Sequence, residues 1–138
     1  MNEQSHAPLR ILVGLESTAL GGTPINALDL AAALRERGHD LSVFAVDEPG
    51  KESVLPYAER LDLTPTILPP GSKMLVRAAQ IHALARQWRA DLVHVYGPWL
   101  TTAAAVATGL GGRRSLLATN WTMENVYYTR SVPVIVGT

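Results

Sequence analysis

The chain has 138 residues, which is enough for one domain with a hydrophobic core and too few for two ordinary domains. Hydrophobic residues make up 47% and charged residues 17%, a composition that excludes an intrinsically disordered chain. Twelve Lys and Arg residues balance twelve Asp and Glu residues, so there is no basic excess of the kind that predicts a nucleic-acid surface.

Cysteine is absent, which removes disulfide bonds, thiolate nucleophiles and cysteine metal sites, and the four histidines show no metal-ligand spacing. The first ten residues, MNEQSHAPLR, are polar and include an acid, unlike a secretory signal peptide. No run of about 18 apolar residues predicts a transmembrane segment. We therefore expect a cytoplasmic protein without a metal or cofactor, for which any membrane contact would be peripheral.

The first predicted unit is a strand, a glycine turn and a helix. Residues 9–15 (LRILVGL) form a short apolar run, typical of a buried strand. In the following turn, Gly21 and Gly22 precede Thr23, a favourable N-cap, and Pro24, which suits the first helical position. Apolar residues at helical spacing follow this turn.

Strands and helices alternate along the rest of the chain. The remaining strands are predicted over residues 41–46, 66–68, 92–96, 115–119 and 132–136. Pro133 favours an edge position for the last of them. The helices are predicted over residues 53–61, from a cap at Ser72 to Trp88, and over residues 99–110.

This alternation predicts right-handed crossovers and one Rossmann-like α/β domain over residues 1–138. We expect a mostly parallel sheet with helices on both faces and the strand order 3-2-1-4-5, with the sixth strand beyond. The sequence ends directly after the last predicted strand, which would leave a sheet face uncovered. We therefore expect a truncated domain or one that a partner subunit completes.

Ligands of such folds bind at the carboxyl ends of the strands where the order reverses, which here means the turns after the first and fourth strands. Gly21, Gly22 and Thr23 lie at a helix N-terminus, where missing side chains and free N–H groups favour a phosphate. The alternative is a tight turn that only needs flexible residues. Tyr96 ends the fourth strand at the same rim.

The segment after the fifth strand, NWTMEN, combines one large ring with polar groups at Trp121, Glu124 and Asn125. Sugar recognition uses that mixture, although a polar loop with one Trp anchored in the core is the alternative. Strand alternation places His94 opposite its neighbouring valines, and we expect a packed histidine. Glu16, after the first strand, either pairs with a substrate hydroxyl or is solvated.

Asp47 ends the second strand, where a ribose-binding acid lies in dinucleotide-binding folds. The first turn, however, lacks the G-x-G-x-x-G spacing that brings the backbone onto a pyrophosphate. A nucleotide-cofactor-binding oxidoreductase domain is therefore the weaker alternative.

Three segments together resemble the opening of retaining GT-B glycosyltransferases of family four. The pair Gly21–Gly22 and residues 37–43 (RGHDLSV) resemble the family's glycine pair and its RGH-x-V-x-V strand. Residues 91–98 (DLVHVYGP) resemble its D-V-V-H-x-H-x-P strand end. Residues 118–125 (ATNWTMEN) resemble the T-N-H-x-M-P-E-N loop of lipid-glycosylating members such as the phosphatidylinositol mannosyltransferases. The resemblance covers nearly the whole chain.

The resemblance implies the acceptor-side domain of an enzyme that moves a sugar from a nucleotide-sugar donor to a hydroxyl acceptor, with retention of configuration and without a metal. Gly21–Gly22 would approach a phosphate across an interdomain cleft. The rim after the fourth and fifth strands would hold the acceptor, which is lipid-linked in the resembled members. The donor-binding C-terminal domain, with its paired-glutamate motif, is not among the 138 residues, so we expect no transfer by the chain alone.

Two positions depart from the family's pattern. Trp121 stands where the loop carries a histidine, and Tyr96 stands where the strand motif carries its second histidine. An indole N–H donates a hydrogen bond but cannot accept a proton. The resemblance therefore assigns no catalytic residue. Altered activity, an acceptor held by stacking, and a non-catalytic sugar- or phosphate-binding module all stay open.

Overall fold

The computed structural model describes residues 7–111, 115–120 and 134–136. One six-stranded sheet runs through it in the order β3-β2-β1-β4-β5-β6, with every neighbouring pair parallel. The strands are β1 (Arg10–Leu15), β2 (Asp40–Val46), β3 (Thr66–Leu68), β4 (Leu92–Tyr96), β5 (Ser115–Asn120) and β6 (Val134–Val136). The helices are α1 (Gly22–Glu36), α2 (Leu55–Arg60), α3 (Met74–Trp88) and α4 (Pro98–Gly111).

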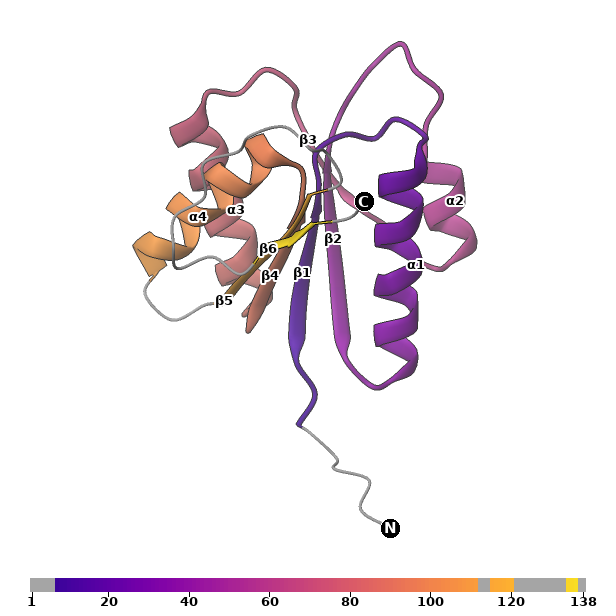
Figure 1. Ribbon diagram of the computed structural model, residues 1–138, viewed down its shortest axis with the longest axis horizontal. Coiled ribbons are helices and arrows are strands. Elements are labelled where there is room, and N and C mark those ends of the chain that lie inside the picture. Colours follow the sequence, from indigo (N-terminus) through magenta and orange to yellow (C-terminus); the bar gives the residue numbers. More distant parts are fainter. Residues whose placement is uncertain (1–6, 112–114, 121–133, 137–138) are drawn as a thin grey trace.

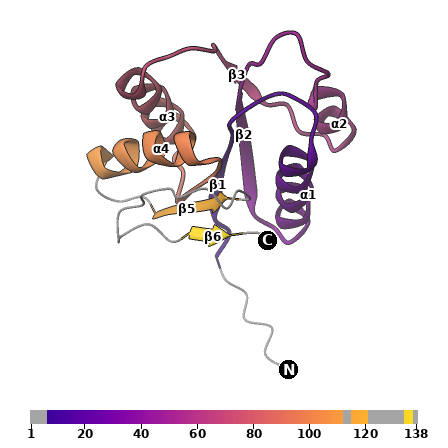
Figure 2. The same ribbon diagram turned by 45° about the horizontal axis from the view of Figure 1, so that its top comes forward.

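Helices cover both faces of the sheet. The helices α1 and α2 lie on one side and α3 and α4 on the other, and the turned view preserves this arrangement (Figures 1 and 2). The Rossmann-like fold class and the strand order predicted from the sequence are therefore confirmed. The sixth strand occupies the sheet edge, as Pro133 led us to expect, although Pro133 itself lies outside the described residues.

The alternation of side chains along β1 divides the core into two layers. Ile11 and Val13 are buried with residues of α1 and α2, whereas Leu12 is buried with residues of α3 and α4. This is the pattern of a central strand that is covered on both faces. Apolar burial on both sides fixes the strand's register, because a shift by one residue would exchange the two layers.

Gly14, near the carboxyl end of β1, is a point of close approach between strands. A Cβ atom at Gly14 would overlap the ring of Phe44 and would lie 2.9 Å from Cγ1 of Val95. Phe44 is fully buried and lies in the layer of α3 and α4. Glycine at this position therefore makes room for the largest fully buried apolar side chain among the described residues of that layer.

The two predicted N-caps, Thr23 and Ser72, are wrong by two residues and one residue. The N-cap of α1 is Gly21, whose backbone is extended, so Thr23 lies inside the first turn and caps nothing. Pro24 is tolerated there because the first-turn N–H groups have no partner within the helix. The N-cap of α3 is Lys73 rather than Ser72, and no side chain caps either helix.

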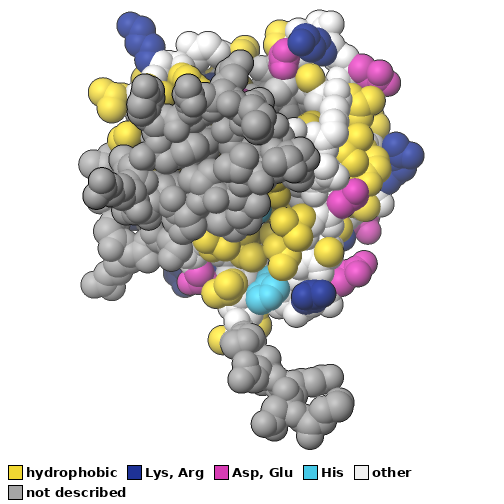
Figure 3. Space-filling view, viewed as in Figure 1, with side chains coloured by type: hydrophobic (Ala, Val, Ile, Leu, Met, Phe, Trp, Pro, Cys, Tyr) yellow, Lys and Arg dark blue, Asp and Glu magenta, His cyan; other side chains and the backbone are white. Residues whose placement is uncertain are grey.

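The surface of the described residues carries interspersed charges. Figure 3 shows one face, on which Lys and Arg side chains alternate around the periphery with Asp and Glu, while apolar side chains gather near the middle. Within the described ranges, none of the helices combines the length and apolar character that crossing a bilayer requires.

Candidate functional site

A cavity of about 440 Å³ lies at the carboxyl ends of β1 and β4. This is the point where the strand order reverses, and therefore the site predicted from the sequence. Its walls come from the turn after β1, the start of α1, the loop after β2, the end of β4 and the start of α4. The polar side chains that line it are Glu16, Ser17, Thr23, Glu48 and Tyr96.

The turn after β1 is held in place by the segment that follows β2. Thr18 donates its N–H to the carbonyl of Val46 (3.0 Å) and accepts the N–H of Val54 on its own carbonyl (2.8 Å). The N–H of Leu20 donates to the carbonyl of Glu52 (2.7 Å). Thr18 is buried, and its hydroxyl accepts the N–H of Glu48 (3.0 Å). One wall of the cavity is therefore a hydrogen-bonded unit that needs no ligand to keep its shape.

Glu48 is an anchored carboxylate on this wall. The hydroxyl of Ser17 donates to it and also accepts the N–H of Ala19 (2.9 Å). The Lys51 ammonium lies 3.0 Å from its other oxygen. The hydrogen bond from Ser17, followed by that from Lys51, lowers the pKa of Glu48 below its usual value. Glu48 therefore carries its negative charge at neutral pH.

Glu16 is the second carboxylate and lies at the start of α4. Its side chain accepts hydrogen bonds from the backbone N–H groups of Trp99 and Leu100. Burial raises the pKa of Glu16, and these two hydrogen bonds act in the opposite direction. The first-turn N–H groups of a helix have no partner within the helix, so Glu16 supplies the cap that α4 lacks in its own sequence.

Gly97 provides the space in which the Glu16 side chain reaches the start of α4. Its φ of +110° lies in the region that side chains rarely adopt. A Cβ atom on it would collide with the carboxylate of Glu16, at 2.6 Å from Cδ and 3.0 Å from Cβ. Both the backbone conformation and the space therefore require glycine between β4 and α4.

Tyr96 and His94 form a stacked pair on β4, with ring centroids 4.6 Å apart. Tyr96 lines the cavity, whereas His94 is only 3% exposed and is absent from its lining. Burial lowers the pKa of His94 to about 4, so its imidazole is neutral at physiological pH. The expected packed histidine is observed, on the opposite side of the sheet from the layer that contains Val93 and Val95.

Gly21 and Gly22 lie beside the cavity at the start of α1, and the fold does not require glycine at either position. A Cβ atom on Gly22 would meet nothing within 4 Å, and one on Gly21 would meet only Pro24 Cδ, at 3.9 Å. Neither residue has a positive φ. The alternative that the turn needs flexible residues therefore loses its support, since the backbone geometry would accept other residues. The glycine pair instead leaves the N-terminus of α1 uncovered.

The structure thus gathers part of the predicted site. Thr23 and Tyr96 line the cavity, and Gly21 and Gly22 adjoin it, while Trp121, Glu124 and Asn125 lie outside the described residues. The binding roles of all seven residues stay predictions.

Sequence reasoning missed two members of the cavity wall, Ser17 and Glu48. The available signal was a hydroxyl residue after β1 and an acid just past β2, but nothing in the sequence paired them. Asp47, the candidate ribose acid, does not line the cavity, and its N–H donates to the carbonyl of Leu68 (2.9 Å). Among the described residues, no group of three His, Asp or Glu side chains has a metal-binding arrangement.

A parallel sheet with a ligand-sized cavity at the reversal of strand order defines a Rossmann-like binding domain. Residues 20–133 match the model of Glycosyltransferase Family 4, and the chain belongs to this family. A comparison with curated proteins finds no match.

Solved structures share the fold at low sequence identity. A glycosyltransferase from Rickettsia africae superposes with a TM-score of 0.62 at 16% identity, over 80% of this chain and 29% of that one. The S. aureus MnaA–UDP complex superposes with a TM-score of 0.60 at 14% identity, over 80% of this chain and 31% of that one. The UDP-GlcNAc 2-epimerase from Methanocaldococcus jannaschii superposes with a TM-score of 0.60 at 17% identity, over 83% of this chain and 32% of that one. The chain therefore spans roughly a third of the length of these proteins.

Proposed function

We propose that this chain is the acceptor-side domain of a glycosyltransferase that moves a sugar from a nucleotide-sugar to a hydroxyl acceptor. The observation that carries the proposal is the open backbone at Gly21 and Gly22 beside the cavity, at the reversal of strand order. A phosphate can approach an uncovered helix N-terminus, whose N–H groups and dipole favour negative charge. Membership of Glycosyltransferase Family 4 supplies the reaction class.

A second protein body completes the site in this proposal. The three solved structures named above are about three times as long as this chain, which supports a functional unit with a further domain. That body would bind most of the nucleotide-sugar and would face the rim that carries Gly22 and Tyr96. The proposal is the same whether this second body is a C-terminal domain of the same protein or a separate partner subunit. A lipid-linked acceptor, as in the phosphatidylinositol mannosyltransferases that the 118–125 loop resembles, is the finer form of the proposal.

The main experiment pairs the chain with the donor-binding half. We expect the purified 138 residues to transfer no sugar from any nucleotide-sugar. We expect sugar transfer when the chain is co-expressed with a donor-binding half that the neighbouring coding sequence encodes. UDP-sugars are the first donors to screen, because two of the structural neighbours are an MnaA–UDP complex and a UDP-GlcNAc 2-epimerase. Robust turnover by the isolated chain would show that no second body is needed.

Within the completed enzyme, Gly22→Val tests the role of the glycine pair. A branched side chain fits the fold here, since nothing lies within 4 Å, but it would block the approach of a phosphate. We expect kcat/KM for the donor to fall by about tenfold to a hundredfold, as misplacement of a reacting group by about 1 Å can cost. The matched control is Gly109→Val, another helical glycine with open space around it. Equal kinetics for the two variants would remove the ligand role of this turn.

A non-catalytic binding module is the second candidate, and one observation favours it. Trp121 replaces a histidine in the loop that resembles the family's pattern, and an indole cannot accept a proton. If this substitution abolished transfer, Trp121→His would restore activity to a completed pair that otherwise only binds its ligands. If neither form of the pair transfers sugar, the binding module becomes the better description.

A further inference from the structure

We propose that Glu16 is a hydroxyl-binding residue of the cavity and that the cavity takes the neutral, polyhydroxylated part of a ligand. The inference rests on the proposed function and specifies the chemistry of its acceptor subsite. It assigns a role to a carboxylate that lies far in the sequence from the glycine and the helix N-terminus that surround it.

The position of Glu16 is fixed by groups that leave part of its carboxylate available. The backbone N–H groups of Trp99 and Leu100 hold it, and Gly97 provides the space for it. An ionised carboxylate has about four lone-pair sites, so two donors do not exhaust its capacity. Glu16 is only partly buried and lines the cavity. Its remaining acceptor sites are therefore within reach of a ligand.

The charge of the cavity wall selects the class of ligand. Both ionisable carboxylic acids on it, Glu16 and Glu48, are acceptors when ionised, and no Lys or Arg is among the described residues that line the cavity. Lys51 lies against Glu48 outside the lining. An anion inside the cavity would meet like charges, whereas a hydroxyl can donate to a carboxylate. Neutral polyols therefore fit the wall formed by Glu16 and Glu48 better than phosphates or sugar acids do, and the phosphate of the proposed donor would lie at the N-terminus of α1 instead.

Size and apolar lining agree with a sugar ring. The volume of about 440 Å³ falls within the range of roughly 300–1,000 Å³ that is typical of small-molecule sites. Leu15, Ala19, Pro24 and Pro98 provide apolar surface between the polar groups. A sugar presents C–H faces to such surface and hydroxyls to the few acceptors, which is the usual division of labour in ligand sites.

The test is a titration of the whole 138-residue chain, labelled with ¹⁵N, with methyl α-D-glucopyranoside and, separately, methyl α-D-glucuronide. The two probes share a ring and differ by a carboxylate. We expect the neutral glucoside, at millimolar concentrations, to shift the amide resonances of Gly97, Trp99 and Leu100. The glucuronide should bind about tenfold more weakly, because a hydrogen bond or repulsion that involves a charge is worth about one decade or more.

Glu16→Gln is the deciding variant. Glutamine keeps the size of the side chain, but one of its two terminal atoms donates, so it cannot both hold two N–H groups and accept freely from a ligand. We expect about tenfold weaker glucoside binding in Glu16→Gln. In Glu36→Gln, an exposed position on α1, binding should be unchanged. Glu16→Asp, with a shorter reach, should also bind more weakly, and its amide spectrum provides a second check that the chain is folded.

Several outcomes would overturn the inference: no glucoside shift up to tens of millimolar, equal binding by Glu16→Gln and the native chain, or glucuronide binding as tight as that of the glucoside. The proposed transfer reaction fails separately. Sugar transfer by the completed enzyme with no effect of Glu16→Gln would retain the reaction and remove the hydroxyl role. Loss of glucoside binding in Glu16→Gln, together with no sugar transfer by the completed enzyme, would retain the hydroxyl role of Glu16 and remove the proposed reaction.

Discussion

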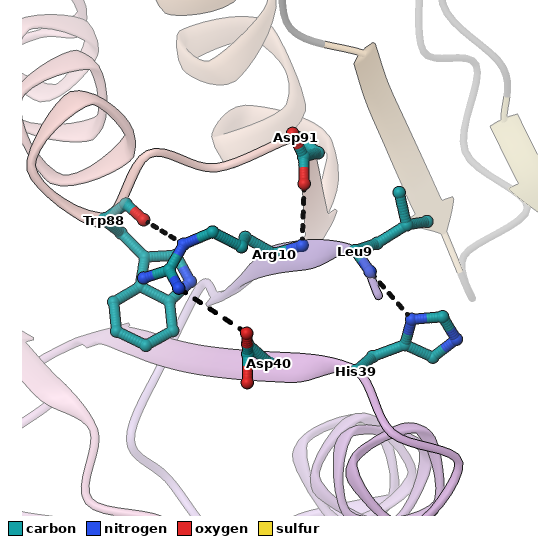
Figure 4. Close-up of polar contacts among 6 residues, drawn as sticks. All are labelled: Leu9, Arg10, His39, Asp40, Trp88 and Asp91. Carbon is teal, nitrogen blue, oxygen red and sulfur yellow. Dashed lines mark hydrogen bonds and ion pairs between the residues drawn. The ribbon is translucent and has the colours of Figure 1, made fainter. Parts of the chain in front are cut away.

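At the amino end of the sheet, polar side chains make contacts within the fold, whereas at the carboxyl end they also line a cavity. Arg10 organises the amino end (Figure 4): its N–H donates to Asp91 (2.9 Å) and its Nε to the carbonyl of Trp88 (2.8 Å). Its guanidinium carbon lies 4.2 Å from the centroid of the Trp88 ring and one nitrogen lies 3.5 Å from Asp40. His39 accepts the N–H of Leu9 (3.0 Å). Arg10 thus connects β1 with β2, with the end of α3 and with the start of β4.

The carboxyl end has comparable groups but a different arrangement. Glu16 reaches the start of α4, and Ser17 and Glu48 pair across two loops, yet all three line a cavity of about 440 Å³. Gly21 and Gly22 leave backbone open beside it. The difference teaches that contacts at the amino end serve the fold, whereas those at the carboxyl end position groups that remain available. Substitutions at the amino end should therefore change stability without changing binding, whereas substitutions at the carboxyl end can change either.

The largest expected effect separates two glycines at the carboxyl end. Gly97→Ala combines a positive φ with a collision against Glu16, so we expect a loss of about 2–4 kcal/mol in the free energy of unfolding. Gly22→Ala, at the first position of α1, meets nothing within 4 Å and should be neutral or stabilising by up to about 1 kcal/mol. Urea denaturation of both variants measures the contrast. Similar losses would mean that the start of α1 is packed after all.

Lowering the pH should decrease the free energy of unfolding through protonation of His94 on β4. Its pKa is about 4 in the folded chain and about 6.5 when unfolded, so the folded state binds fewer protons in this interval. The stability that neutral His94 provides is complete above pH 6.5 and is lost as the pH falls toward 4. The loss reaches about 3 kcal/mol at the low end, at roughly 1.4 kcal/mol per pH unit.

Unfolding free energies measured between pH 7 and pH 4 check this dependence. His94→Gln should flatten the curve over this interval, because the titrating ring is gone. His39→Gln, at the amino end, should leave the slope from His94 in place. Amide signals near Tyr96, which stacks on His94, should change before those near Trp88. Simultaneous changes at both ends would contradict the proposed separation.

Much of the fold was predictable from the sequence, because parallel α/β architecture follows from the order and periodicity of its elements. Apolar runs placed β3 and β4 at their observed bounds, and β1, β2 and β5 within one residue. The doubly wound arrangement that is typical of such alternation then predicted the strand order. Helix starts were less predictable, because Gly21 and Lys73 cap α1 and α3 without any side-chain hydrogen bond that a sequence motif would reveal.

The location of the cavity was predictable from the sequence, but the pairing of the side chains around it was not. Strand order alone places ligands after β1 and β4, and the cavity lies there. The contact between Glu16 and the start of α4 joins residues more than eighty positions apart, and no spacing rule connects them. Ser17 and Glu48 meet only because the loops after β1 and β2 are hydrogen-bonded together. Such pairings depend on loop conformation, which propensity and periodicity do not determine.

The smallest expected effect tests the comparison from the amino end. Arg10→Ala removes one hydrogen bond and a cation–π contact, together worth about 1–2 kcal/mol, while the half-exposed pair with Asp40 adds little. Arg37→Ala, at an exposed residue at the end of α1, is the matched control and should change the unfolding free energy by less than about 0.5 kcal/mol.

The informative readout for Arg10→Ala is binding at the other end of the sheet. If contacts at the amino end serve only the fold, the variant should bind methyl α-D-glucopyranoside as the native chain does, at temperatures well below its lowered melting point. Binding weakened as much as in Glu16→Gln would show that β1 transmits changes from Arg10 to the cavity. The two ends would then form one cooperative unit, because a rigid central strand couples the position of its first residue to that of its last.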